Sequence, residues 1–300
     1  SLLFLFFLES FYAFGAVSGF VDSKQVTQRR PMGVDFNSNG TKMFVVGTVE
    51  NKIFEFDLTT GFDVSTATKN SNVCDFVGLG SDVVDIEFNS DGTKLFLADQ
   101  GGDDAIEEFD LSTAYDVSSC THVEEHFAGD FQLVGIEFNS SGTKLFIYDM
   151  TGTDSIKQYS LNSPYNLSNI TLQKQSTGTS DRTFSTIENQ PSGFTFSSDG
   201  SKMFITGKNK SKVQEFNLST PFDLSSVSKT DAYNVAGQID TVAGITFSAD
   251  GLKMFVLDSK NNADNKDVNE YDLTCGFGVV KCIDPTANKD DVASIETQSE

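Results

Sequence analysis

Three carboxylates at matching positions are the residues of this sequence whose types and spacing best suit chemistry. Asp35, Glu87 and Glu137 each stand two residues before an Asn in a recurring stretch, and later copies of that stretch carry Thr195 and Thr246 instead. Oxygen-rich clusters of carboxylates suit Ca²⁺. If the fold brings these positions together, the sequence predicts an acidic cluster that holds calcium. The alternative is a set of solvated carboxylates around a wet channel.

Other groups that could support catalysis are sparse. His122 and His126 are the two histidines of the chain, and we expect them at the surface of an outer strand. The sequence contains neither a G-x-S-x-G nucleophile elbow nor a glycine-rich phosphate loop. Because catalysis requires a nucleophile, base or metal in a converging arrangement, the residues favour a protein that is not an enzyme. The catalytic alternative is metal-dependent hydrolysis through the three carboxylates.

A repeat of about fifty residues must position these side chains. The stretch IEFNSDGTKLFLAD at 86–99 recurs, with conservative changes, at 34–47, 136–149, 194–207 and 245–258. A second shared stretch follows each copy, as in IEEFDL at 106–111, and a third follows that, as in YDVS at 115–118. Five copies of three linked stretches indicate five structural repeats.

Each repeat is typical of β-strands. Alternating apolar and polar residues lead into a tight turn such as Asn-Ser-Asp-Gly, where the glycine supplies a positive φ, and a second strand follows. The second shared stretch predicts a third strand, and irregular stretches such as 121–127 and 182–188 predict a fourth. Tandem four-stranded units of this length are the signature of a β-propeller.

We therefore predict an all-β propeller of four-stranded blades. Five blades is the simplest count, and a six-bladed ring with an incomplete blade is the alternative. The predicted boundaries are an apolar N-terminal segment at 1–25, the propeller at 26–283, and a closing strand or tail at 284–300.

The turn-and-strand pattern Asn-Ser-Asp-Gly-Thr-Lys-Leu-Phe, followed by Asp-Leu-Ser-Thr, resembles the propeller repeats whose turn is Ser-Pro-Asp-Gly. These include the YVTN-type repeats of microbial surface-layer proteins and the lactonase-like propellers. The resemblance covers residues 33 to about 282 and departs from the pattern in lacking the turn proline. It implies a propeller fold and, from the lactonase-like members, a metal in the channel. Propellers carry many activities, so the resemblance leaves the function open.

Four cysteines allow several pairings. Cys275 and Cys282 flank a short Gly-Phe-Gly turn, so either a local disulfide or two buried thiols fits that spacing. Cys74 and Cys120 lie late in consecutive repeats and could bridge neighbouring units.

The apolar start of the chain has three interpretations: a signal remnant, an extra strand, or a segment used in assembly. Glu9 interrupts its apolar run, which makes a membrane span a poor fit. The assembly interpretation rests on a set of large apolar side chains, Leu2, Leu3, Phe4, Phe6, Phe7 and Phe11.

Charge and sequons point to the compartment. The chain has 21 Lys and Arg against 43 Asp and Glu, a net charge of −22, which argues against a nucleic-acid partner. Asn166 and Asn169 lie in N-x-[ST] sequons of a predicted loop and are candidate glycosylation sites. Possible disulfides, these sequons and the signal-like start of the chain together predict an extracellular or cell-surface protein.

The favoured function is a non-catalytic propeller in a surface layer, appendage or adhesive assembly. Its expected partner is a second copy of the chain, another surface protein or a glycan. A ligand-binding propeller and a metal-dependent lactonase-like hydrolase are the alternatives.

Overall fold

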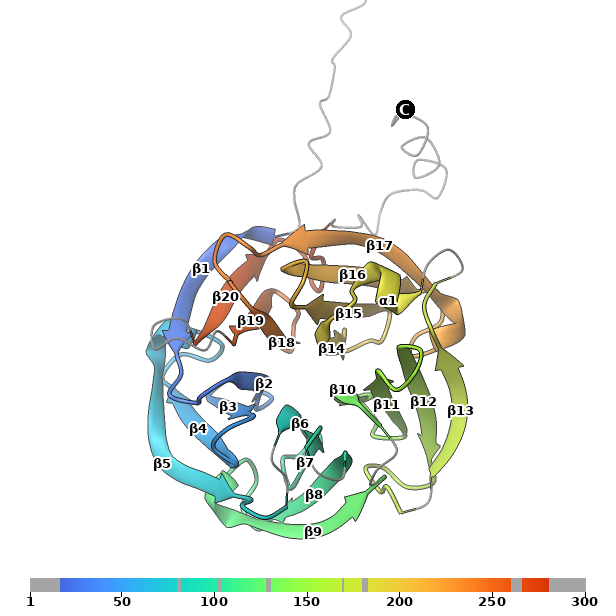
Figure 1. Cartoon of the computed structure of the whole chain (residues 1–300). Helices are drawn as coiled ribbons and strands as arrows, with labels where there is room; N and C mark the ends of the chain where they lie inside the picture. Colours follow the sequence, from blue (N-terminus) through green and yellow to red (C-terminus); the bar gives the residue numbers. More distant parts are fainter. Residues whose placement is uncertain are drawn as a thin grey trace, which may run out of the picture.

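Five four-stranded antiparallel sheets stand around a central axis like the blades of a propeller (Figure 1). The computed structural model describes residues 17–79, 82–101, 104–127, 131–168, 170–179, 183–259 and 266–280. Blade 1 contains β2 (Pro31–Phe36), β3 (Lys42–Gly47), β4 (Lys52–Leu58) and β5 (Ala67–Asp75). Blade 2 contains β6 (Val83–Phe88), β7 (Lys94–Asp99), β8 (Ala105–Leu111) and β9 (Cys120–His126). Blade 3 contains β10 (Leu133–Phe138), β11 (Lys144–Asp149), β12 (Ser155–Leu161) and β13 (Ile170–Ser176).

The remaining two blades follow the same order from the axis outwards. Blade 4 contains β14 (Pro191–Phe196), β15 (Lys202–Gly207), β16 (Lys212–Leu218) and β17 (Val227–Asn234). Blade 5 contains β18 (Val242–Phe247), β19 (Lys253–Asp258), β20 (Asp267–Leu273) and, as its outermost strand, β1 (Val17–Gln25). Short 3₁₀ turns, η1 (Val64–Thr66), η2 (Val117–Ser119) and η3 (Leu224–Ser226), precede the outer strands of blades 1, 2 and 4.

The tight turn between the first two strands of each blade forms because its residues satisfy it locally. In blade 2 the N–H of Gly92 donates to the carbonyl oxygen of Asn89 at 3.0 Å, and Gly92 has a φ of +72°. The Asp91 carboxylate accepts the N–H of Thr93 at 3.0 Å, which fixes the start of the next strand. The predicted turn is therefore confirmed in its position and its chemistry.

The core lies between neighbouring blades, since a single sheet has two apolar faces and must bury both. A phenylalanine of each second strand packs against a phenylalanine of the first strand in the next blade. The ring centroids are 4.5–4.8 Å apart in all five seams: Phe44–Phe88, Phe96–Phe138, Phe146–Phe196, Phe204–Phe247 and Phe255–Phe36. This repeated pair gives the ring its five-fold regularity.

The ring closes through β1, which pairs with β20 in antiparallel register from Val17 to Gln25. Residues 17–25 of the predicted 1–25 segment therefore form an outer strand of blade 5, as in the extra-strand interpretation. The described residues form five blades, so the six-bladed alternative is wrong. The predicted closing strand or tail at 284–300 lies outside the described residues.

One expected strand is absent from the place that the sequence indicated. The fourth strand of blade 3 was expected at 182–188, but Ile170–Ser176 forms it, and Phe184–Ile187 forms a single turn of helix, α1. Phe184 and Ile187 are buried between blades 3 and 4, so packing rather than strand pairing decides the conformation of this stretch.

Candidate functional site

The carboxylates that the sequence singled out lie on the innermost strands, in the part of the ring nearest the axis (Figure 1). Asp35 is on β2, Glu87 on β6 and Glu137 on β10, and all three side chains are partly exposed. Glu87 lies close enough to Asp35 and Glu137 to feel both charges. Blades 4 and 5 place Thr195 and Thr246 at the same position. The structure thus brings the predicted residues together on one side of the channel.

Asp35 uses both of its carboxylate oxygens to bind backbone. One oxygen accepts the N–H of Phe36 at 2.7 Å, and the other accepts the N–H of Phe88 in blade 2 at 3.3 Å. The backbone N–H of Phe138 in blade 3 likewise lowers the pKa of Glu87, against the larger opposing effect of burial. These carboxyl groups therefore connect consecutive blades at the channel wall.

A fourth channel carboxylate, Asp85, was not among the predicted site residues. Its two oxygens accept the N–H groups of Ile86 at 2.9 Å and of Ile136 in blade 3 at 3.0 Å. The available signal was that Asp85 replaces the glycine found at this position in the other four blades. That signal marks a difference between blades but does not reveal the contact with Ile136.

Burial is the main influence on the acidity of this group. It raises the pKa of Asp35 to about 7 and, together with the charge of Asp35, that of Asp85 to about 8, against the opposing effect of their backbone hydrogen bonds. Burial and neighbouring carboxylates also raise the pKa values of Glu87 and Glu137 well above their usual range. These shifts favour the neutral form of the carboxyl groups near the axis.

The geometry does not fit the predicted calcium site. Among the residues that the structure describes, no three Asp, Glu, His or Cys side chains converge as a metal ion would require. Asp35 and Asp85 already direct both oxygens at backbone N–H groups, whereas a calcium ion needs six to eight oxygen ligands. We therefore assign no chemistry to a metal at Asp35, Glu87 and Glu137.

A cavity of about 300 Å³ opens at the mouth of the channel, on the side of the tight turns. Asp35, Glu87, Tyr115, Asn139 and Tyr165 are among its lining residues. The Tyr115 hydroxyl donates to the carbonyl oxygen of Ser90 at 3.2 Å, and burial raises the pKa of Tyr115 to about 12. The cavity combines aromatic rings with amide, hydroxyl and carboxyl groups, which suits a small polar ligand.

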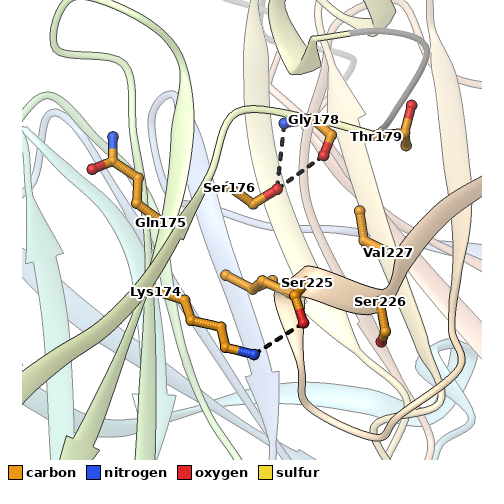
Figure 2. A pocket seen from close by; sticks show the side chains of 9 residues that line it. Lys174, Gln175, Ser176, Gly178, Thr179, Ser225, Ser226 and Val227 are labelled. Carbon is orange, nitrogen blue, oxygen red and sulfur yellow. Dashed lines mark hydrogen bonds between the residues drawn. The ribbon is translucent and has the colours of Figure 1, made fainter.

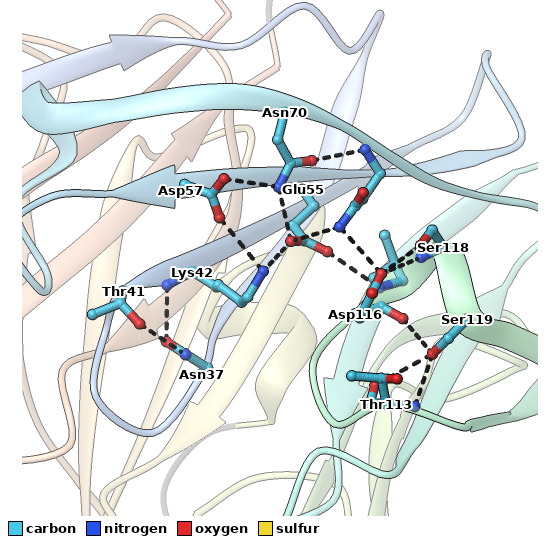
Figure 3. Close-up of polar contacts among 12 residues, drawn as sticks. Asn37, Thr41, Lys42, Glu55, Asp57, Asn70, Thr113, Asp116, Ser118 and Ser119 are labelled. Atoms are coloured by element: carbon cyan, nitrogen blue, oxygen red, sulfur yellow. Dashed lines mark hydrogen bonds and ion pairs between the residues drawn. The ribbon is translucent and has the colours of Figure 1, made fainter.

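Polar links of a second kind join the blades farther from the axis (Figure 3). The buried Glu55 carboxylate binds the Lys42 ammonium of its own blade and accepts the N–H of Val117, the first residue of η2 in blade 2, at 3.2 Å. Asn72 donates to Asp116, the residue that caps η2, at 3.1 Å. An ion pair inside one blade thereby holds the 3₁₀ turn of the next.

Three other seams repeat this link. In each, a side-chain oxygen accepts backbone N–H groups of the next blade. Glu270 accepts from Val64 at 2.9 Å, Glu215 from Val279 and Val280 at 3.0 Å, and Gln158 from Leu224 at 3.4 Å. In blade 3 the lysine at the usual position, Lys144, faces the neutral Gln158 rather than a glutamate. It donates instead to the carbonyl oxygen of Phe222 at 2.9 Å.

The seam between blades 2 and 3 departs from the pattern through histidine. Glu108 binds Lys94 at 2.5 Å and His126 at 2.9 Å. His126 is buried, and the partly buried His122 lies 2.7 Å from Glu107, so the expectation of surface histidines is wrong for His126. Both histidines are far from the channel strands and pair with carboxylates of β8, which gives them a structural role.

The cysteine pairing that bridges consecutive repeats is present. Cys74, at the end of β5, forms a disulfide with Cys120, at the start of β9, with a Cα–Cα distance of 5.9 Å. Cys275 lies in the turn after β20, and its expected partner Cys282 is outside the described residues.

The remaining predicted sites lie at the surface or outside the described residues. Asn166 is exposed, and its side-chain oxygen accepts the N–H of Ser168 at 3.0 Å. Its neighbour Asn169 is outside the described residues. So are the candidate assembly residues Leu2, Leu3, Phe4, Phe6, Phe7 and Phe11.

A lateral groove of about 710 Å³ separates blades 3 and 4 at the outer rim (Figure 2). Lys174 reaches across it to Asp223 and, at 3.0 Å, to Ser225. Ser176 binds the backbone of Gly178 on the other part of the wall. Side chains on both walls of the groove are therefore hydrogen-bonded within the protein. The contacts of Lys174 with Asp223 and Ser225 bridge the two blades.

Within the described ranges, no helix is long and apolar enough to span a bilayer. No protein-family model matches the chain, and no curated protein matches it.

Two solved structures resemble the chain at low identity. A protein of unknown function from Desulfotomaculum acetoxidans is 12% identical, with a TM-score of 0.45, over 76% of this chain and 62% of that chain. The β-propeller domain of Myceliophteria thermophila Cps50 (Swd1) is 8% identical, with a TM-score of 0.45, over 81% of this chain and 84% of that chain. The aligned part thus spans less than two thirds of the first of these proteins, and neither similarity bears on function.

Proposed function

We propose that the chain is a non-catalytic extracellular β-propeller with a structural role in a surface layer, an appendage or an adhesive assembly. One observation carries this proposal: several carboxylates that could perform chemistry bind the backbone of a neighbouring blade, and a histidine pairs with a carboxylate inside its own blade. Asp35 and Asp85 bind backbone of the next blade, Glu55 and Glu215 do the same at the outer seams, and His126 pairs with Glu108. This arrangement favours a structural role over a catalytic one, because catalysis requires a free base or nucleophile.

The disulfide between Cys74 and Cys120 supports the extracellular part of the proposal, because disulfides persist mainly in oxidising compartments. The resemblance of the repeats to YVTN-type surface-layer propellers points the same way. The formal net charge of the full sequence, −22, also fits, since a charge far from zero keeps a protein soluble.

The assembly contact that we propose is the apolar segment before Val17. The segment directly precedes Val17, the first residue of β1, which is the outermost strand of blade 5. Apolar side chains such as Phe4 and Phe7 gain free energy when a neighbour covers them.

Negative-stain electron microscopy of the full chain, together with sedimentation velocity, tests this proposal. We expect regular filaments or sheets from the unmodified chain and isolated discs from the double variant Phe4→Ser/Phe7→Ser. The matched control is Val77→Ser, which removes an exposed apolar side chain elsewhere and leaves assembly unchanged. Discs from the unmodified chain, or equal assembly by the double variant, would contradict a self-assembling scaffold.

A ligand-binding propeller is the second candidate, and the cavity at the channel mouth favours it. A panel of glycans and small polar metabolites, screened by thermal shift, tests this function. A true ligand raises the melting temperature of the unmodified chain but not that of Ser140→Trp, in which an indole fills the mouth. If every compound leaves both proteins unchanged, the cavity has no ligand in the panel and the structural role gains weight.

A further inference from the structure

Strand β1 comes to blade 5 from the opposite end of the chain (Figure 1). Within its sheet it pairs with β20 alone, from Val17 opposite Leu273 to Gln25 opposite Asp267. Each of the other outer strands directly follows the third strand of its own blade in the sequence, apart from a short loop. On its C-terminal side β1 is joined to the ring by residues 26–30 only, so it can leave its sheet without displacing another strand.

The pairing of β1 with β20 is less regular than the other outer pairings. Its register shifts twice, between Val17 and Gly19 and between Phe20 and Asp22, whereas each of the other outer pairings shifts once. No side chain of β1 is fully buried, and Phe20 is 41% exposed although its ring meets Tyr271 edge-on at a centroid distance of 5.9 Å. Segments with few buried contacts open at low cost in free energy.

The link from β1 to β2 is short and strained. It has five residues, whereas the links from the other outer strands to the next blade have six to fourteen. Arg30, its last residue, has a φ of +48° and directly precedes Pro31. A left-handed backbone is costly for a residue with a side chain, and a following proline favours an extended one. Among the described non-glycine residues with a positive φ, Arg30 is the only one in front of a proline.

Gln28 adds to the cost of this link. Its side chain is fully buried, and Nε2 donates to the carbonyl oxygen of Gly47 at a long 3.5 Å. Within the described part of the chain, Oε1 of Gln28 has no hydrogen-bond partner, which is unfavourable for a buried polar atom. Val26 instead continues the pairing with blade 5, since its N–H donates to the carbonyl oxygen of Lys266 at 2.8 Å. The strained part of the link is therefore 27–30.

We propose that β1 is exchanged between copies of the chain: it leaves β20 of its own ring and completes blade 5 of a second copy, with 27–30 as the hinge. The contacts of β1 with β20 are the same in the closed and the exchanged form, so they favour neither. The hinge differs, because it relaxes when it extends, and short strained hinges favour such exchange. Mutual exchange gives a dimer, and exchange in one direction gives a chain of copies. This contact is distinct from the apolar segment before Val17 and does not depend on it.

A pair of cysteines across β1 and β20 in the full chain tests the exchange. Gln25 and Asp267 are directly opposite each other and neither is buried, so Gln25→Cys/Asp267→Cys disturbs little packing. Equal amounts of ¹⁵N-labelled and unlabelled protein are refolded together at high concentration, oxidised and digested. We expect joined peptides in which one partner is labelled and the other is not, because β1 of one chain faces β20 of another. Joined peptides that carry a single kind of label would show that the ring closes on itself.

The hinge is tested in the same cysteine background. Glycine accepts a positive φ, so Arg30→Gly should shift the equilibrium towards closed rings roughly fivefold. The matched control is Arg30→Lys, which keeps the charge and the strain and should leave the share of mixed peptides unchanged. Phe4→Ser/Phe7→Ser should also keep the mixed peptides, so a failure of the proposed apolar contact is distinguishable from a failure of the exchange. Equal shares from Arg30→Gly and Arg30→Lys, or loss of the mixed peptides in Phe4→Ser/Phe7→Ser, would overturn the proposal.

Discussion

The backbone N–H of Tyr115 donates to the carbonyl oxygen of Gly92 at 2.9 Å, and the Tyr115 ring occupies the place where a β-carbon on Gly92 would stand. Both residues have a positive φ, +72° for the glycine and +55° for the tyrosine. The same pairing recurs in every blade, as Gly40–Phe62, Gly142–Tyr165, Gly200–Phe222 and Gly251–Phe277. It ties the tight turn after the first strand to the loop that leaves the third strand.

This pairing predicts that Gly92→Ala destabilises the protein by about 2–4 kcal/mol. The new methyl group would lie 2.2 Å from the Tyr115 ring, so the ring must leave the glycine, and alanine also strains the positive φ. Urea unfolding, monitored by circular dichroism, gives the change in the free energy of unfolding.

Gly152→Ala is the control that separates packing from backbone strain. Gly152 has nearly the same φ, +73°, but no atom lies within 4 Å of an added β-carbon. We expect a loss of about 1 kcal/mol there, from the positive φ alone. Equal losses at the two positions would show that the Tyr115 ring contributes nothing.

The fold was predictable because the same pattern of strands and turns occurs five times in the sequence. Each turn glycine, such as Gly92, marks a position that needs a positive φ, and a signal seen in five copies is hard to mistake. The fourth strand of blade 3 was misplaced because the outermost strands of the five blades differ in sequence. Ile170–Ser176 has a partner on one edge only, so few contacts constrain its side chains.

The position of the channel carboxylates was predictable from the sequence, but their hydrogen bonds to the next blade were not. The common register of Asp35, Glu87 and Glu137 placed them on the innermost strands. That Asp35 accepts the N–H of Phe88, 53 residues later, depends on how two blades meet, which no local pattern encodes. The pairing of Cys74 with Cys120 was predictable, because both cysteines lie late in consecutive repeats, and it joins the outer strands of neighbouring blades. Asp85 was visible as an exception, but its partner was not.

The buried ion pair of blade 4 predicts a large effect of a single charge removal. Lys202 lies 2.7 Å from Glu215, whose side chain is 1% exposed. Lys202→Met leaves that carboxylate buried without its cation, and we expect a loss of about 3 kcal/mol in the free energy of unfolding. Lys52→Met is the matched control, because Lys52 pairs with Asp75 at 3.4 Å in an exposed position, where the loss should stay below about 1 kcal/mol. If the two variants lose the same free energy of unfolding within error, the Lys202–Glu215 pair contributes no more than an exposed ion pair.

The disulfide between blades 1 and 2 predicts a measurable loss when it is removed. It closes a segment of 46 residues, for which chain entropy gives a stabilisation of about 4 kcal/mol, and measured values usually fall between 2 and 4. The double variant Cys74→Ser/Cys120→Ser should therefore unfold at lower urea concentration with a similar slope. Mass spectrometry of a non-reducing digest should recover the two cysteine peptides joined together. Recovery of both peptides as free thiols from the purified protein would contradict the link and weaken the proposal of an extracellular location.

Glu108 predicts a loss of stability in acid. Burial alone would raise its pKa, but the hydrogen bonds from His126 and Lys94 outweigh burial and hold the pKa below its usual value. A lowered pKa means that the unfolded chain binds the proton more tightly, so the stabilisation is present above about pH 4.5 and is lost as the pH falls through the folded pKa.

Glu108→Gln should therefore unfold more readily than the unmodified chain at pH 6, and this gap in stability between the two proteins should narrow at pH 3. Glu125→Gln, at an exposed position of β9, is the control and should show no gap at either pH. A gap for Glu108→Gln that stays constant from pH 6 to pH 3 would mean that packing of the side chain, not its charge, links it to His126 and Lys94.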